Sequence, residues 1–501
     1  MHDLDEETLD RPHEECGVVG LWAKKGSGVE VARNLFFALY ALQHRGQEAA
    51  GICTSDGTLV NIHKGLGLVS QVFNEDNLRP LQGHFGIGHN RYSTTGGNHI
   101  ANVQPFYIQT LHGPVAVAHN GNLTNATVMR DAMMSRGVGF ISTSDTEVIT
   151  QFLARPSMNV RADRPNWEAR LAHLGEEAEG AYSLAILTRE AIFAMRDPLG
   201  LRPMCLGALK GEDGKHTAWI VASESAALLT IGASFIRDLK PGEIIRIDDD
   251  GPRTVREPHE RAPKPALCIF EYVYFARPDS HIEGQSVHVV RQRLGRRLAQ
   301  EAPVEADIVI GVPDSSLVAA QAYAHVAGLP YVDGLIKNRY IGRTFIQPSQ
   351  QMRKNQVRLK FTALRDNLEG KRVILVDDSI VRGTTMGPLV SLVRDGGRAK
   401  EVHVRVASPP IQHPCFMGVD LASHDQLIAH RMTVEQIRAH IGADSLAYIT
   451  RDGLHAAVGE GARPGMGHCD ACFSGRYPVD VSAFGLDDGK LQFESRKRGE
   501  D

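Results

Sequence analysis

Short apolar segments separated by glycine-rich turns make up much of the first half of the chain. Each is continuously apolar, or alternates apolar with polar residues, over about four to eight positions, which is typical of β-strands. A longer segment, residues 29–44, has the apolar spacing of a helix. We therefore expect a strand-rich layered domain with a few helices, and its strand segments include residues 17–23, 86–89, 115–119, 182–187 and 218–222.

The second half has a different pattern, in which apolar runs alternate with helical stretches. The runs are residues 308–312, 373–376 and 402–406, and the helical stretches include residues 315–327 and 388–394. This alternation predicts a parallel sheet flanked by helices.

Between the two halves lies a polar stretch punctuated by proline. Asp248-Asp249-Asp250-Gly251-Pro252 opens it, and it continues to Pro263 and Pro265. This composition is typical of a linker between domains. A chain of 501 residues has room for about two to four domains, and we expect two.

Charge and cysteine content limit the classes of protein that fit. The formal net charge of −4 gives no overall attraction to nucleic acid or to anionic membranes. No run of about 18 apolar residues occurs, so we expect no transmembrane helix. Seven cysteines in 501 residues suit a reducing compartment better than a disulfide scaffold, and the prediction is a cytoplasmic protein.

The first fifteen residues form an acidic leader that ends at a cysteine. The leader holds seven Asp or Glu residues and no apolar core, so it is not a secretion signal and is typical of a removable tail. Removal would leave Cys16 with both a thiol and a free α-amine. A thiol with a pKa of about 8.5 is mostly protonated at neutral pH, whereas an amine with a pKa of about 7.7–8.0 can accept its proton. The alternative is a small buried residue at the start of a strand.

The clearest phosphate chemistry lies in residues 373–386 of the second half. An apolar strand ends in Asp377 and Asp378, and a loop containing Gly383 leads to a helix that Thr384 or Thr385 can cap. Backbone N–H groups at such a helix entry bind phosphate, and the paired carboxylates can hold sugar hydroxyls and a magnesium ion. The alternative is an ordinary strand-to-helix turn.

This segment resembles the phosphoribosyl pyrophosphate signature of type I phosphoribosyltransferases. The resemblance implies that the acidic pair holds the ribose hydroxyls and Mg²⁺ and that the loop holds the 5-phosphate. The strand end at residues 311–316 would face the same crevice, which makes Ser315 a further candidate metal ligand. The implied substrate-binding residues are Asp377, Asp378, Ser379, Arg382, Gly383, Thr384 and Thr385.

A basic segment lies between these two strand ends. Residues 337–360 contain seven Lys or Arg and no Asp or Glu. By itself this indicates a solvated basic face or an RNA-binding patch. The segment also resembles the lid that closes over pyrophosphate in glutamine-dependent phosphoribosyltransferases. That resemblance implies that Lys337, Arg339 and Arg343 neutralise the leaving pyrophosphate.

Four strings in the first half place further polar residues in a fixed order. They are residues 42–51, residues 88–94, His119-Asn120-Gly121 and Ser144-Asp145. Taken alone, Asn120-Gly121 indicates a type I′ hairpin turn. Together with Cys16 the strings resemble the N-terminal-nucleophile (Ntn) glutaminase domain of class II amidotransferases.

That resemblance assigns roles to individual residues. Cys16 would attack the side-chain amide of glutamine, while Arg91 pairs with the α-carboxylate and Asp145 with the α-ammonium of the substrate. The Asn120 side chain and the Gly121 N–H would form the oxyanion hole.

Both halves, with Tyr274-Phe-Ala-Arg-Pro-Asp-Ser280 after the linker, resemble in order the glutamine phosphoribosylpyrophosphate amidotransferase family. The implied fold is an α+β four-layer Ntn glutaminase domain followed by an α/β type I phosphoribosyltransferase domain with a parallel sheet. The implied division is a propeptide at residues 1–15, the glutaminase at 16–255 and the transferase with a cluster-binding segment at 256–501. Ammonia from glutamine would pass by an enclosed route to phosphoribosyl pyrophosphate, giving 5-phosphoribosylamine, glutamate and pyrophosphate in the first committed step of purine (IMP) biosynthesis.

The remaining cysteines bear on a metal centre. Cys53 and Cys205 have apolar surroundings typical of packing, and the pair Cys469-Asp-Ala-Cys472 alone indicates a redox pair or half a zinc site. With Cys268 and Cys415 it could bind zinc or a [4Fe-4S] cluster equally well by count. The resemblance to the iron-sulfur branch with a cleaved propeptide implies a [4Fe-4S] cluster on Cys268, Cys415, Cys469 and Cys472.

The family resemblance also implies purine nucleotides as feedback inhibitors and a homotetramer, with no nucleic acid or membrane as partner. One alternative is a non-catalytic regulator that senses phosphoribosyl pyrophosphate and binds nucleic acid through residues 337–360. The other transfers ammonia to a sugar phosphate isomerisation domain, which shares the first half but lacks the 373–386 segment.

Overall fold

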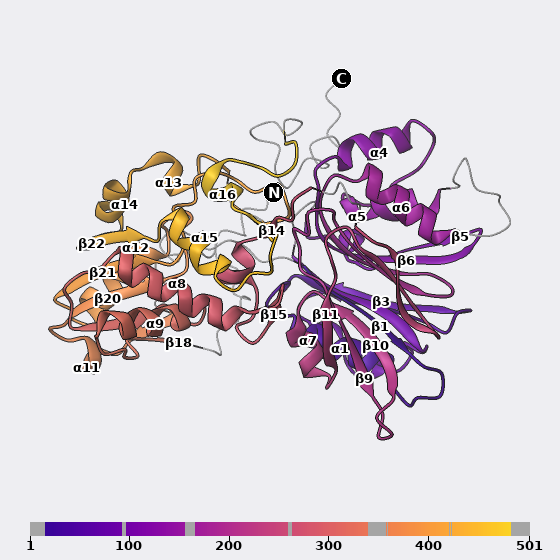
Figure 1. Cartoon of the computed structure of the whole chain (residues 1–501), viewed down its shortest axis with the longest axis horizontal. Helices are drawn as coiled ribbons and strands as arrows, with labels where there is room; N and C mark the ends of the chain where they lie inside the picture. The colour runs from indigo at the N-terminus through magenta and orange to yellow at the C-terminus, as the bar shows by residue number, and fades with distance from the viewer. Residues whose placement is uncertain are drawn as a thin grey trace.

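The computed structural model of the chain describes residues 16–92, 97–155, 166–258, 263–338, 357, 359–419, 421 and 423–481. These residues form two lobes that contact each other, with the first half in indigo to magenta and the second half in orange and yellow (Figure 1). The leader at residues 1–15 and the predicted lid residues Arg339 and Arg343 lie outside the described residues.

Two antiparallel sheets form the centre of the first lobe. The seven-stranded sheet has the order β11-β9-β10-β1-β4-β2-β3 and the six-stranded sheet the order β13-β12-β8-β7-β6-β5. The first sheet consists of β1 (Gly17–Ala23), β2 (Ala49–Ser55), β3 (Val60–Leu66), β4 (Phe85–Arg91), β9 (Cys205–Lys210), β10 (His216–Ala222) and β11 (Ser234–Asp238). The second consists of β5 (Phe106–Thr110), β6 (Gly113–Leu123), β7 (Gly180–Leu187), β8 (Ile192–Arg196), β12 (Ile244–Asp248) and β13 (Gly251–Arg256).

Helices cover the outer face of each sheet, which gives four layers (Figure 1). Leu35 and Leu39 of α1 (Val31–Ala41) pack on the seven-stranded sheet together with α7 (Ser225–Thr230). The inner faces of the two sheets share a core that includes Trp22 and Phe85. The other outer helices are α4 (Ala126–Met134), α5 (Asp145–Ala154) and α6 (Trp167–Glu177), and shorter ones are α2 (Val69–Val72), α3 (Glu75–Leu78) and η1 (Ile100–Asn102).

A four-stranded parallel sheet, β17-β20-β21-β22, forms the centre of the second lobe. Along β20, Val373 and Leu375 pack against one layer of helices, and Ile374 and Val376 pack against the other. This strand is apolar on both faces because helices cover both. The strands are β17 (Ile308–Gly311), β20 (Arg372–Asp377), β21 (Glu401–Val406) and β22 (Ser445–Tyr448). The helices are α8 (Val287–Glu301), α9 (Leu317–Ala327) and α15 (Arg451–Gly459) on one face, and α12 (Met386–Ser391) and α14 (Val434–Ile441) on the other.

Short strands and helices connect the main elements of the second lobe and lie at its margins. Two small pairings matter below, β14 with β23 and β18 with β19. The short elements are β14 (Leu267–Cys268), the π-helix η2 (Glu271–Phe275), β15 (His281–Ile282), β16 (Gln285–Ser286), β18 (Leu335–Lys337), β19 (Phe361–Ala363), α11 (Arg365–Leu368), the π-helix η3 (Leu392–Gly396), α13 (Ile428–Arg431), β23 (His468–Cys469) and α16 (Ala471–Ser474).

The layered first half and the parallel sheet of the second half are confirmed, and two details are corrected. The stretch predicted as linker begins as a hairpin, since Asp248 pairs with Gly251 and Asp249-Asp250 form the turn. The interpretation of Asn120-Gly121 as a hairpin turn is wrong, because both residues lie inside β6. None of the helices in the described residues combines the length and hydropathy needed to cross a membrane.

Candidate active sites and cysteine cluster

Cys16 lies directly before β1, opposite the end of β4. Its Sγ is 3.4 Å from the carbonyl oxygen of Tyr92, and the residue is buried. Burial raises the pKa of the thiol to about 11, and the nearby Arg91 offsets this only in part. The thiol is therefore protonated at neutral pH, so it needs a base to become a nucleophile.

Asn120 and Gly121 lie toward the carboxyl end of β6, and both are buried. Within the described residues, neither the Nδ2 nor the Oδ1 atom of Asn120 has a hydrogen-bond partner. Such an atom costs folding free energy, so it points to a ligand that completes the site. Gly121 has φ of 142°, and a methyl group there would lie 2.0 Å from the carbonyl oxygen of Ala181. Only glycine fits this position.

Asp145 is the first residue of α5, and the Ser144 hydroxyl caps this helix by accepting from the Thr146 N–H at 3.2 Å. The Asp145 carboxylate accepts from the Leu123 N–H at 3.0 Å and lies 3.6 Å from Nδ1 of His119. Burial alone would raise its pKa, but His119 and the backbone donors lower the pKa below its ordinary value. The carboxylate is thus charged and suited to bind an ammonium group.

The Arg91 guanidinium is buried at the end of β4. Its Nη2 donates to the Gly97 carbonyl at 3.1 Å, and its Nη1 is 3.9 Å from the Glu48 carboxylate. Arg91, Asp145 and Glu48 all act electrostatically on the Cys16 thiol. The structure therefore gathers a cation and an anion around the predicted nucleophile. The strings did not reveal that Glu48 lies beside Arg91 or that His119 lies beside Asp145.

The second group of predicted residues lies at the carboxyl edge of the parallel sheet. Ser316 donates to Oδ1 of Asp377 at 2.8 Å, Ser315 donates to the Asp378 carboxylate, and Ser379 donates to Oδ1 of Asp378 at 2.9 Å. These residues meet because β17 and β20 are parallel neighbours, so their ends share one edge.

The loop after Asp378 returns over the same edge. Gly383 has φ of 78°, and Nε of Arg382 donates to Oε1 of Gln426 at 3.2 Å. Helix α12 starts after Thr385 as predicted, but the Thr385 side chain makes no capping hydrogen bond to the helix, and Thr384 is exposed. The loop thus keeps its predicted place, without the predicted cap.

Lys337 ends strand β18 beside this edge. Its Nζ is 2.7 Å from the Asp314 carboxylate, and Asp314 follows β17. The amine is therefore held near the site in which Asp377 and Asp378 lie.

Four cysteines converge where the lobes meet. Parallel pairing of β14 with β23 places Cys268 opposite Cys469, and the backbone N–H groups of Gln412 and His413 donate to the Cys472 carbonyl at 2.9 and 3.0 Å. Burial raises the pKa of Cys268 and Cys469 to about 12, and neighbouring thiols add to this. The thiols that influence one another are those of Cys268, Cys415, Cys469 and Cys472.

The other two cysteines after Cys16 pack in the first lobe as expected. Cys53 lies between the two sheets, and Cys205 lies under the outer helices. In the part of the chain that the structure describes, no three His, Cys, Asp or Glu side chains already form a closed metal site.

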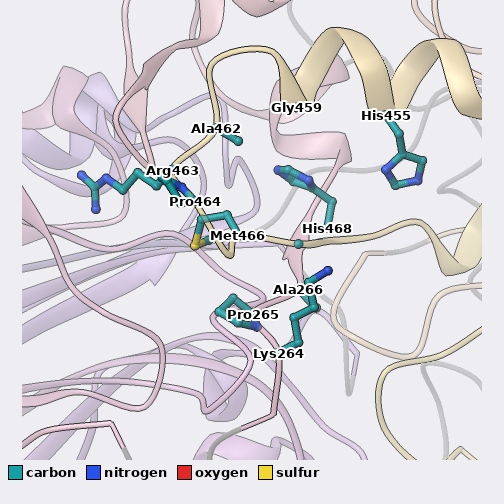
Figure 2. A pocket seen from close by; sticks show the side chains of 11 residues that line it. Lys264, Pro265, Ala266, His455, Gly459, Ala462, Arg463, Pro464, Met466 and His468 are labelled. Carbon is teal, nitrogen blue, oxygen red and sulfur yellow. The ribbon is translucent and has the colours of Figure 1, made fainter.

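A pocket of about 570 Å³ lies next to the cysteines (Figure 2). Lys264 and Pro265 line one side of it, and Arg463 and Met466 line the other. His468 also lines the pocket. Burial, together with the nearby His455 and Lys264, lowers the pKa of its imidazole to about 4. The pocket contains none of the predicted substrate-binding residues.

Two family models match the chain, a glutamine amidotransferase domain over residues 89–230 and a phosphoribosyl transferase domain over residues 284–408. The amidophosphoribosyltransferase of Synechococcus elongatus is 48% identical over 96% of this chain and 94% of its own length. The chain belongs to the amidophosphoribosyltransferase family. The amidophosphoribosyltransferase of Rattus norvegicus is 46% identical over 93% of this chain and 98% of its own length.

Solved amidophosphoribosyltransferase structures have the same fold. The glutamine phosphoribosylpyrophosphate amidotransferase from B. subtilis, complexed with ADP and GMP, superimposes with a TM-score of 0.85 at 43% identity, covering 94% of this chain and 99% of its own. Membership of the amidophosphoribosyltransferase family makes the protein an enzyme of purine biosynthesis that uses glutamine to aminate phosphoribosyl pyrophosphate. The two alternative interpretations, a non-catalytic regulator and an enzyme with a sugar phosphate isomerisation domain, are therefore wrong.

Proposed function

We propose that glutamine is hydrolysed at Cys16 and that the ammonia reacts with phosphoribosyl pyrophosphate at the edge formed by Asp377 and Asp378. The Asn120 side chain carries the first half of this proposal. Its buried amide has no hydrogen-bond partner within the described residues, as an oxyanion donor awaiting its substrate would. The serines that fix both aspartates support the second half.

In the glutaminase site, Arg91 pairs with the α-carboxylate of glutamine and Asp145 with its α-ammonium. The Cys16 Sγ then attacks the amide carbon, while the α-amine of Cys16 takes the thiol proton. Nδ2 of Asn120 and the N–H of Gly121 stabilise the negative oxygen. As the C–N bond breaks, the amine returns the proton to the leaving nitrogen, which departs as ammonia. Water then hydrolyses the thioester to glutamate.

Removal of the leader is part of this mechanism. While residues 1–15 remain attached, the Cys16 nitrogen is an amide and cannot accept a proton. The buried thiol, with its pKa of about 11, then lacks its base. Cleavage between Glu15 and Cys16 therefore activates the glutaminase.

In the transferase site, ammonia attacks C1 of the ribose and displaces pyrophosphate, giving 5-phosphoribosylamine. The loop from Ser379 through Arg382, Gly383 and Thr384 to Thr385 holds the 5-phosphate. Asp377 and Asp378 hold the ribose hydroxyls. Lys337, with Arg339 and Arg343, neutralises the departing pyrophosphate.

A magnesium ion fits the same edge. Ser315, Asp377 and Asp378 supply only oxygen atoms, which this hard cation prefers, and two carboxylates with substrate phosphates are a common Mg²⁺ environment. When bound, the ion would offset the negative charge of the pyrophosphate. The protein's own contribution is to hold both carboxylates in place through the serine hydroxyls.

The four thiols that influence one another are a donor set that either zinc or a [4Fe-4S] cluster could use. We propose the cluster, because the positions of these cysteines resemble those of the iron-sulfur branch of the family. When bound, the cluster would tie β14, the loop at Cys415 and the segment from β23 to α16 together.

Metal analysis tests the cluster. Protein purified without oxygen should contain four iron atoms and four acid-labile sulfides per chain, and Cys472→Ser should lower both. One zinc per chain with no iron would contradict the proposal.

We further propose purine nucleotides as feedback inhibitors, a homotetrameric assembly and a cytoplasmic location. The solved relative that binds ADP and GMP supports nucleotide inhibition. The sparse, unpaired cysteines support a reducing compartment.

Replacement of one residue tests the division between the two sites. Cys16→Ala should abolish glutamine-dependent synthesis of phosphoribosylamine and preserve the synthesis from added ammonia, because only the first site needs the thiol. Loss of both activities in a variant with an unchanged unfolding temperature would contradict two separate sites.

A further inference from the structure

Three consecutive residues of the second lobe touch the glutaminase strand β6 and its surroundings. Nδ2 of Asn122 donates to the Phe416 carbonyl at 2.9 Å, the buried Arg202 guanidinium donates to the Met417 carbonyl, and Gly418 lies against Gly121. Residues 416–418, named the bracing segment below, thus meet the strand at the position of the oxyanion donors.

The contact between the two glycines leaves no room for a side chain. Gly418 has φ of 98°, and a methyl group on it would lie 2.9 Å from the carbonyl carbon and 3.1 Å from Cα of Gly121. Gly121 also lies close to the carbonyl of Ala181 in β7. The Gly121 backbone is therefore in close contact with both its own sheet and the second lobe.

The bracing segment is itself anchored. The Met417 N–H donates to Sγ of Cys415 at 3.3 Å, and Met417 is buried among side chains of both lobes, including Leu201. Asn122, which follows Gly121, is fixed to the same segment. The contacts of Gly418 reach the Cα atom and the carbonyl group of Gly121. Through that Cα atom, a rigid neighbour can hold the preceding peptide plane, which carries the Gly121 N–H, to the tolerance that an oxyanion hole requires.

We infer that the bracing segment positions the Gly121 N–H, so that the second lobe completes the oxyanion hole of the glutaminase. This inference rests on the proposed role of Asn120 and Gly121. Its consequence is that the first lobe supplies the nucleophile, whereas full transition-state stabilisation requires both lobes. A shift of about 1 Å at a reacting centre can cost roughly 100-fold in rate.

Gly418→Ala tests the inference, and Gly442→Ala is its matched control. Gly442 also belongs to the second lobe and has φ of 72°, but its Cβ would meet nothing within 4 Å. Both substitutions put a side chain on a left-handed residue, and only Gly418→Ala presses on Gly121. We expect Gly418→Ala to lower kcat for glutamine hydrolysis about 10- to 100-fold with KM within about twofold, because the contact acts on the transition state. Synthesis from ammonia should stay unchanged in both variants.

The outcomes separate this inference from the proposal beneath it. An unchanged kcat for glutamine in Gly418→Ala, or an equal loss in Gly442→Ala, overturns the inference. If Asn120→Ala keeps full glutaminase activity, the oxyanion assignment itself fails.

If Gly418→Ala does not fold, Asn122→Ala replaces it, since this variant removes the hydrogen bond to Phe416 without adding volume. It should lower kcat for glutamine in the same direction, and a wild-type kcat overturns the inference.

Discussion

The reactivity of Cys16 depends on two groups that differ in their titration. The thiol, with a pKa raised to about 11 by burial, does not ionise by itself near neutral pH. The free α-amine of a processed chain has an ordinary pKa of about 7.7–8.0 and accepts a proton only when it is neutral. The rate of glutamine hydrolysis should therefore follow the fraction of the α-amine that is neutral.

We predict that kcat/KM for glutamine rises with pH up to about pH 8 and then levels off, because protonated amine cannot act as the base. A chain that retains residues 1–15, verified by intact mass, should show no glutaminase activity at any pH and should keep its synthesis from ammonia. Equal glutaminase activity in the two chains would contradict the activation by cleavage.

At this scale the sequence predicted the residues that occur in recognisable strings, such as Arg91, Asn120 and Asp145. It could not predict the contact between Gly121 and Gly418, because the two glycines are distant in sequence and meet only when both lobes are folded. Nor does the spacing reveal that His119 lies beside Asp145, since that contact joins β6 to α5.

The elements of the second lobe follow from their sequence patterns. Strand β20 was predicted from an apolar run that serves both faces of the sheet, and the aspartates at its end lie where a parallel sheet binds ligands. The hairpin from Asp248 to Gly251 was missed, because acidic residues followed by Gly-Pro indicate both a tight turn and a linker. The pairing of β13 with β12 depends on neighbours that the local sequence does not show.

The two edges of this sheet allow a matched comparison. We predict that Asp378→Asn lowers synthesis from ammonia at least about tenfold, because the variant loses a charge that holds substrate and Mg²⁺. Asp307→Asn, at the opposite edge beside Arg372 at 3.0 Å, should change the rate less than about twofold. Steady-state rates with phosphoribosyl pyrophosphate and ammonia decide this. Equal effects of both substitutions would contradict a site at the carboxyl edge.

At the scale of the whole molecule, buried ion pairs join the lobes. The fully buried Arg45 guanidinium pairs with two carboxylates. Its Nη1 is 2.5 Å from Oε1 of Glu224 in the first lobe, and its Nη2 is 2.6 Å from Oε1 of Glu271 in the second. Burial alone would lower the pKa of Arg45, but the two carboxylates raise it above its ordinary value. Burial would likewise raise the pKa of Glu224, but His44 and Arg45 lower it.

The sign of the pH effect follows from the lowered pKa of Glu224. Its stabilising contribution is complete above the unfolded-state pKa of about 4.3 and is lost as the pH falls below that value toward the folded-state pKa. We predict that Arg45→Met lowers the free energy of unfolding by about 3–5 kcal/mol at pH 7, because it leaves two carboxylates buried without their cation. Denaturant unfolding measures this.

The control for Arg45 is Arg33, whose guanidinium pairs on the surface with Glu30 and Glu75. Arg33→Met should change the free energy of unfolding by less than about 1 kcal/mol, because exposed ion pairs contribute little. Similar losses in the two variants would contradict a stabilising role for the buried contact between lobes.

The most direct test of the two-site reaction follows the nitrogen atom. The processed enzyme is given phosphoribosyl pyrophosphate, glutamine labelled with ¹⁵N at the amide, and unlabelled ammonium in the medium, and the phosphoribosylamine is trapped as it forms. If ammonia passes directly from the Cys16 site to the Asp377–Asp378 site, the product contains a higher ¹⁵N fraction than the ammonium in solution. A product with the same ¹⁵N fraction as the surrounding ammonium would show that the ammonia escapes, and it would contradict coupling of the two lobes.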